Sequence, residues 1–127
     1  MKKALFAFAS TLLLAGALHA QTPTQLARAE QRLSHEILNA YLTGAHPQQH
    51  LLELQRIQRQ LKASVSDPEI SNLLSFLDLC IQELQGTIHR PLTPGNIEIV
   101  SDLTTSIDEG SRFILSSAQE SRHLAAR

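Results

Sequence analysis

The chain of 127 residues contains one cysteine, one tyrosine and no tryptophan, and only 18% of its residues are charged. A single cysteine excludes a disulfide scaffold and the paired cysteines of a Cys-x-x-Cys motif. Lys+Arg 11 against Asp+Glu 12 gives a formal net charge of −1, which excludes a basic nucleic-acid-binding domain. Nucleophile elbows and glycine-rich phosphate loops are also missing, so we expect no enzymatic activity.

Residues 1–20 have the three parts of a secretory signal peptide. Lys2 and Lys3 form a cationic start, a mostly apolar run follows over 4–14, and small residues come next. This run is shorter than the roughly 20 residues that a membrane-spanning helix needs. Cleavage after Ala17 fits the preference for small residues at the cut, whereas cleavage after Ala20 leaves a more typical mature start. We therefore expect a bacterial signal peptide and a periplasmic or secreted protein.

Residues 21–127 are the predicted mature domain. Removal of the leader leaves 107 residues with a net charge of −3, because Lys2 and Lys3 are lost. A chain of this length suffices for one core that buries roughly 65% of the unfolded surface. No later segment is apolar for long enough to span a bilayer. We therefore expect a single soluble domain without a membrane span.

Four blocks with helical periodicity make up this domain, and each break between them contains a proline. Apolar residues recur at steps of three and four in every block, which places them on one helix face. The predicted helices span 24–42, 47–66, 68–89 and 96–122. Short connections between helices of similar length predict an all-α, up-down-up-down antiparallel four-helix bundle. The predicted caps are Thr22 or Thr24, Gly44, Asp67, and Thr93 or Asn96.

A strand is a competing interpretation for residues 97–100, because Ile97, Ile99 and Val100 are β-branched. The apolar stripe nevertheless continues in heptads as far as Ile114, which a period of two cannot supply. We therefore predict a helix here. Gly110 falls on its inner face and is expected to allow the close approach of another helix, at Phe76 or Tyr41.

Four potential metal ligands fall at one end of the predicted bundle: His46, His50, His89 and Glu98. Imidazoles four residues apart can share a metal ion. A third nitrogen and a carboxylate oxygen would complete a tetrahedral Zn site or a nitrogen-rich Cu or Ni site. The alternative is that these side chains lie near helix ends and are only solvated. The spacing leaves both interpretations open.

The layout resembles that of the periplasmic four-helix b-type cytochromes in length, in its signal peptide and in His123, the fifth residue from the C-terminus. The resemblance implies that His123 would bind haem b together with a methionine near the mature N-terminus. The corresponding residues 25–27 are Gln-Leu-Ala, and Met1 is the only methionine. A ligand is therefore missing, and we expect no cofactor.

A basic strip on the second predicted helix is a candidate partner-binding surface. Arg56, Arg59 and Lys62 follow one another at steps of three and suit an acidic partner, although a solvated helix face would look the same. Three charges without interleaved aromatic residues are too few for nucleic acid. A homodimer is also open, since four leucines lie off the main stripes: Leu38, Leu42, Leu52 and Leu115.

Three other positions have structural interpretations. Cys80 lies on the core stripe, where we expect a buried thiol of raised pKa and low reactivity. His35 is expected to be solvated or to form a hydrogen bond between helices, and Asp108 pairs with Arg112 at the i, i+4 spacing. The chain as a whole predicts an exported, non-enzymatic bundle that binds a protein or a small ligand through a helix face or a bundle end. The alternative is a periplasmic metal- or haem-binding protein.

Overall fold

The chain folds into four α-helices without strands over the residues that the structure, a computed structural model, describes: 21–125, with side chains up to 118. The helices are α2 (Pro23–Thr43), α3 (Gln48–Ser64), α4 (Pro68–Thr87) and α5 (Pro94–Ala125). The prediction of an all-α protein with four helices is confirmed, and every boundary lies within three residues of the expected one. The predicted signal peptide lies outside the described residues.

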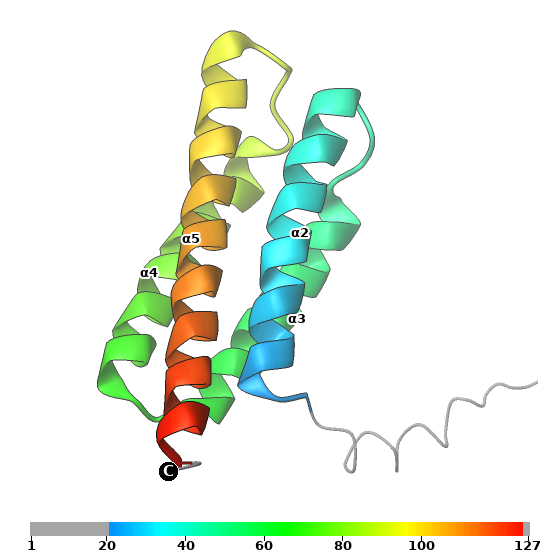
Figure 1. The fold of residues 1–127 in the computed structure, drawn as a ribbon. Helices are drawn as coiled ribbons and strands as arrows, with labels where there is room; N and C mark the ends of the chain where they lie inside the picture. Colours follow the sequence, from blue (N-terminus) through cyan, green and yellow to red (C-terminus); the bar gives the residue numbers. More distant parts are fainter. Residues whose placement is uncertain (1–20, 126–127) are drawn as a thin grey trace, which may run out of the picture.

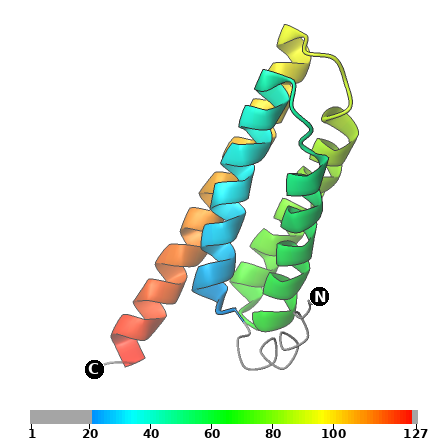
Figure 2. The same cartoon turned by 90° about the vertical axis from the view of Figure 1, so that its right-hand side faces the viewer.

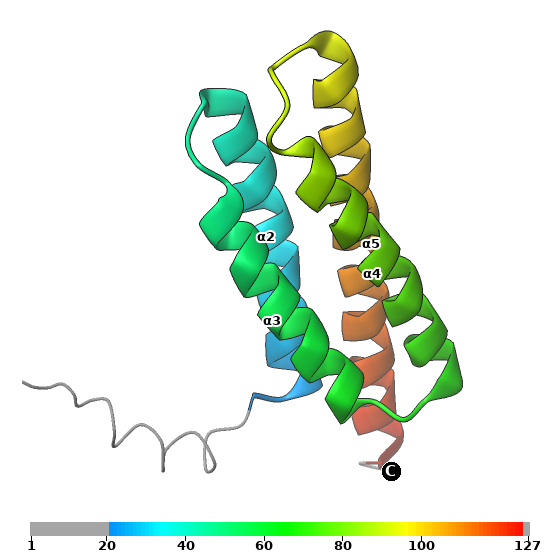
Figure 3. The same cartoon turned by 180° about the vertical axis from the view of Figure 1, so that it is seen from behind.

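The helices form two layers of two. α2 and α5 lie side by side in the layer facing the viewer of Figure 1, and α3 and α4 form the layer seen in front in Figure 3. Each helix packs against two neighbours, since α2 contacts α3 and α5, and α4 contacts the same two helices. Figure 2 shows the layers edge-on, with α5 continuing past the other helices.

The two ends of the bundle have different compositions. Residues 44–50 and 88–93 lie together at one end, which we call the histidine end (Figure 1). Residues 22–24, 64–67 and 114–118 lie together at the other, which we call the serine end because Ser64, Ser66 and Ser117 belong to it.

Side-chain caps begin three of the helices as the sequence predicted. Thr22 is the cap of α2, where its Oγ1 accepts from the Gln25 amide at 3.1 Å and the Gln25 side chain accepts from the Thr22 amide at 2.9 Å. Asp67 accepts from the Glu69 amide at 2.8 Å. Such caps satisfy amides that have no partner within the helix.

The structure shows which residue caps α5 and whether residues 97–100 form a helix or a strand. The Asn96 amide donates to Thr93 Oγ1 at 3.1 Å, so Thr93 is the cap and Pro94 the first helical residue. Residues 97–100 are helical, and the strand interpretation is wrong. The earlier start follows from proline, which fits the first turn of a helix because its missing N–H would have no partner there.

The core consists almost entirely of leucine and isoleucine, and it includes the crossing of α4 and α5. A Cβ atom added to Gly110 would lie 2.9 Å from both Cδ atoms of Leu77. The prediction of a close approach at Gly110 is confirmed, but the neighbour is Leu77 rather than Phe76 or Tyr41. Phe76 is 50% exposed, because one residue rotates a helical side chain by about 100°. The largest fully buried apolar residues are Leu26, Leu33, Ile37, Leu54, Ile57, Leu61, Leu74, Leu77, Leu84, Ile107 and Val100.

Candidate functional site

A pocket of about 430 Å³ opens at the serine end of the bundle. Three segments distant in sequence form it: the start of α2, the turn between α3 and α4, and residues 114–118 of α5. Buried or half-buried apolar side chains form its floor, including Val65, Ile70 and Ile114. Residues with hydroxyl groups also line the pocket: Thr22, Thr24, Ser64, Ser66 and Ser117. Small-molecule sites typically combine an apolar lining with a few polar groups in this way.

A short turn between α3 and α4 lines this pocket. Val65 is extended (φ −114°, ψ 131°) and ends α3, and Asp67 and Pro68 begin α4 two residues later. Asp67 is the one charged residue among the described side chains that line the pocket, and its Oδ1 already accepts from Glu69. The pocket therefore suits a small, uncharged ligand with an apolar body and a hydrogen-bonding group.

At the histidine end, the structure brings two of the four predicted metal ligands together. His46 and His89 line a depression of about 320 Å³ that also contains Tyr41. Nδ1 of His89 lies 3.1 Å from the side-chain amide nitrogen of Gln48, which has only hydrogens to offer. That ring nitrogen therefore accepts a hydrogen bond from Gln48 and is not free for a metal ion.

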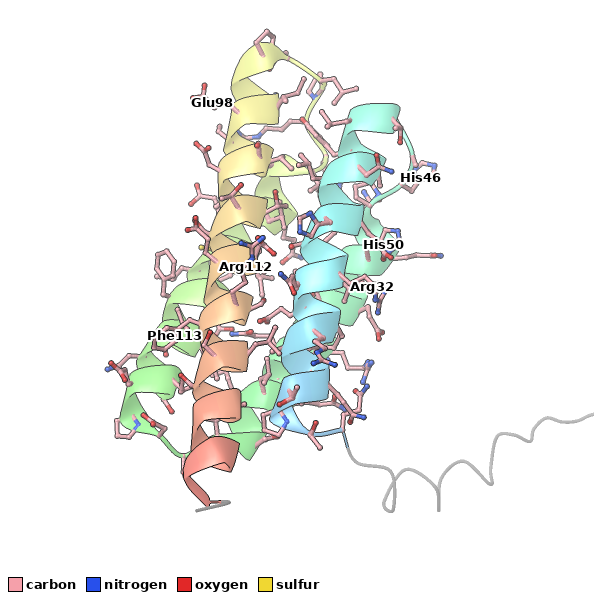
Figure 4. The ribbon with its side chains drawn as sticks, in the orientation of Figure 1. Arg32, His46, His50, Glu98, Arg112 and Phe113 are labelled. Carbon is pink, nitrogen blue, oxygen red and sulfur yellow. The ribbon has the colours of Figure 1, made fainter. Side chains whose placement is uncertain are left out.

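The other two predicted ligands point elsewhere. Nδ1 of His50 lies 3.4 Å from Oε1 of Glu36 on α2. Glu98 lies on the outer side of α5, far from His46 and His50 (Figure 4). Among the described residues, no group of three or more His, Cys, Asp or Glu side chains is arranged to hold a metal ion. The predicted topology brings these residues to one end of the bundle, but helix rotation places them on different faces.

The predicted basic strip is exposed on α3, but two of its three charges have acidic partners within the chain. Arg56 forms an ion pair with Glu53 one turn earlier. Lys62 lies 2.6 Å from Asp78 on α4. Arg59 is exposed. Docking of an acidic partner on this strip stays a prediction, and so does haem binding, since the side chain of His123 is not among those described.

The four leucines expected outside the core divide into two pairs. Leu42 and Leu52 are exposed, whereas Leu38 and Leu115 pack partly buried against the core. Other large apolar side chains are also exposed, among them Phe76 and Leu79 on α4. Phe113 on α5 is exposed as well (Figure 4). The exposure of these residues does not decide whether the chain forms a homodimer, which stays a prediction.

Glu30, Gln58 and Ser111 are among the buried polar side chains that the sequence analysis missed. Oε1 of Glu30 lies 3.2 Å from Oγ of Ser111, which joins α2 to α5, and Oε2 of Glu30 has no hydrogen-bond partner. The amide nitrogen of Gln58 donates to the Leu74 carbonyl at 2.7 Å, and its Oε1 has no partner. Polar atoms without partners are costly in a core, so these positions are exceptional.

Burial changes the acidity of Glu30. Loss of solvation raises its pKa from an ordinary 4.5 to about 7. The hydrogen bond with Ser111 lowers the pKa in part, and the negative charge of Asp78 raises it further. Glu30 is thus a carboxyl group that stays protonated well above the pH at which an exposed glutamate ionises.

Two polar predictions are confirmed. Nε2 of His35 lies 3.2 Å from Asp108 on α5, so His35 forms the expected contact between helices. Arg112 lies 3.1 Å from the other oxygen of Asp108. Cys80 is buried, and burial followed by the charge of Glu83 raises the pKa of its thiol. Each of these groups has a structural explanation and needs no functional one.

Comparison with known proteins gives no relative from which a function could be transferred. No model of a known family, no curated protein and no solved structure matches the chain. Within the described helices, no segment is both long and apolar enough to cross a membrane. A functional proposal must therefore rest on the described side chains themselves.

Proposed function

We propose that this chain is an exported, non-enzymatic, up-down-up-down four-helix bundle that binds a small uncharged ligand in the pocket at its serine end. The apolar floor of that pocket carries the proposal, because Ile70 and Ile114 belong to the core and yet line an open space. The ligand would place its apolar body on this floor and its hydrogen-bonding group among the surrounding hydroxyls. Export of the chain would be seen as a mature protein lacking 17 or 20 residues in mass spectra of the periplasmic fraction.

The volume of the pocket supports a ligand of small-molecule size. About 430 Å³ lies within the range of roughly 300–1,000 Å³ that ligand pockets occupy. The depression at the histidine end is smaller, and its lining includes exposed polar residues such as Gln48 and His89. The serine end is therefore the stronger candidate for an apolar ligand.

A neutral fluorescent probe, N-phenyl-1-naphthylamine, tests this proposal. Its fluorescence rises in apolar surroundings, so we expect a saturable increase with one site per chain. Ser117→Trp should abolish that increase, because Ser117 lines the pocket and the indole would fill it. Circular dichroism of the variant would show whether the helices are retained.

Ser116→Trp is the matched control, since Ser116 is exposed and does not line the pocket. It adds the same aromatic group one residue away and should leave probe binding unchanged. Equal binding by the wild-type chain and both variants would show that the probe binds elsewhere, and the proposed pocket would be rejected.

A metal-binding function is the second candidate, and one observation favours it. His46 and His89, two of the four predicted ligands, share the depression at the histidine end. Two histidines alone leave two positions of a tetrahedral site without a protein ligand. Metal binding would therefore require His50 to leave Glu36 and turn toward the other two.

A further inference from the structure

Glu30 is a carboxyl group in the core without a cation. Its relative exposure is 0%, and none of the ion pairs within the described part of the chain includes it. Asp108 is the other buried carboxylate described, and it has both His35 and Arg112 beside it. A buried carboxylate without a cation is strongly disfavoured, and it normally takes up a proton instead.

The contacts of the Ser111 hydroxyl also indicate that Glu30 is protonated. Oγ of Ser111 lies 2.8 Å from the Ile107 carbonyl and 3.2 Å from Oε1 of Glu30. A hydroxyl has one hydrogen and cannot donate fully to both oxygens. If Glu30 is protonated, Ser111 donates to Ile107 and accepts the hydrogen of Glu30, so both contacts become hydrogen bonds.

The charged groups on the surrounding helices do not favour ionisation of Glu30. Asp78 of α4 is negative, and Lys62 of α3 lies beside Asp78. On α5, Arg112 lies beside Asp108. On α2 itself, Arg32 pairs with Glu36 and Arg28 is exposed, while the buried polar residue of α3, Gln58, carries no charge. Each nearby cation already has an acidic partner or lies in solvent.

We propose that Glu30 is an acid-dependent lock between α2 and α5. As a neutral acid it bridges the two helices through Ser111, and as a carboxylate it places an uncompensated charge in the core and weakens their contact. The lock is independent of the pocket at the serine end, since Glu30 does not line it. Such a device would make the bundle tighter in acidic surroundings than in neutral ones.

The direction of the pH effect follows from the two ionisation states. The pKa of Glu30 is about 7 in the folded chain and would return to about 4.5 on unfolding. Between these values the folded state holds a proton that the unfolded state releases, so stability falls as pH rises. Below about 4.5 and above about 7 the contribution of Glu30 becomes constant.

Unfolding of the purified protein by urea, measured from pH 4.5 to pH 8, tests the lock. We expect Glu30 to reduce the folding equilibrium constant by about two orders of magnitude across this range. Glu30→Gln keeps the shape of the side chain and cannot ionise, so it should remove this fall and stabilise the protein at pH 8. Glu109→Gln changes an exposed glutamate of α5, so this variant should still lose stability as the pH rises.

Carbon-13 NMR of the glutamate carboxyl groups gives a direct second measurement on the unmutated chain. The resonance that disappears in Glu30→Gln should titrate with a midpoint near 7. A midpoint near 4.5 would overturn the proposal, and so would an unchanged pH profile of unfolding in Glu30→Gln. If Glu30→Gln does not fold, the midpoint of the most basic glutamate resonance in the unmutated chain decides between the two outcomes.

Discussion

Gly86 and Gly110 are both helical glycines, and their surroundings differ. A Cβ at Gly86 would meet no atom within 4 Å, whereas one at Gly110 would lie 2.9 Å from two atoms of Leu77. Leu77 is itself fully buried, so its side chain has little room to move away. Gly86 therefore shows the intrinsic cost of glycine within a helix, whereas Gly110 allows two helices to approach closely where they cross.

We predict that alanine has opposite effects at these positions. Gly86→Ala should raise the free energy of unfolding by up to about 1 kcal/mol, the usual advantage of alanine in a helix. Gly110→Ala should lower it by about 1–2 kcal/mol, because the added methyl group overpacks the contact with Leu77. Urea denaturation of the two variants measures both changes. Equal stabilisation would mean that α4 and α5 can separate without cost.

The helix ends show how local signals determine an element. Asp67 begins α4 by accepting a hydrogen bond from the Glu69 amide at 2.8 Å, and Gly44 follows α2 with a left-handed φ of 78°. Only residues next to one another in sequence take part in these arrangements. They were therefore predictable from the sequence, as were the four helices and the close approach at Gly110.

The α4 cap should have a measurable effect on stability. Asp67→Ala removes the acceptor for the Glu69 amide, and we expect it to lower the free energy of unfolding by about 1 kcal/mol. Ser66→Ala is the control, because Ser66 is exposed and its side chain does not cap the helix. A loss of equal size in both variants would assign the effect to the turn as a whole.

The buried polar residues could have been found from the same periodicity. Glu30 occupies a heptad position between Leu26 and Leu33, and Gln58 lies between Leu54 and Leu61 in the same way. The apolar stripes described above pass over both positions because only apolar residues were counted. The serine-end pocket had no comparable signal, since it depends on how three distant segments meet after the helices have packed.

At the scale of the whole molecule, the two halves of the chain differ in charge. Among the exposed charges that the structure describes, arginine and lysine predominate on α2 and α3, whereas acidic residues predominate on α4 and α5. Ion pairs such as Lys62 with Asp78 join the halves at the surface. Exposed pairs of this kind contribute at most about 1 kcal/mol each, so the apolar core accounts for most of the association.

The distribution of histidines over the bundle leads to a prediction about metals. Titration with Zn²⁺, Cu²⁺ or Ni²⁺, followed by calorimetry, should show only weak binding, because just two of the four predicted ligands, His46 and His89, line a common depression. Replacement of His50 and His89 together by alanine should therefore change the titration little. Tight binding of one metal ion per chain, lost in the double variant, would instead establish the metal-binding alternative.

Tyr41 gives this molecule an optical reporter at a defined place. Its hydroxyl lies 3.1 Å from the Arg90 carbonyl and 3.0 Å from that of Pro91, and so connects α2 to the segment that leads into α5. The chain has no tryptophan and no second tyrosine. At excitation wavelengths that phenylalanine does not absorb, ultraviolet emission from the unlabelled protein therefore comes from this one ring. Its intensity during rapid dilution from denaturant would time the docking of that segment, without any dye or substitution.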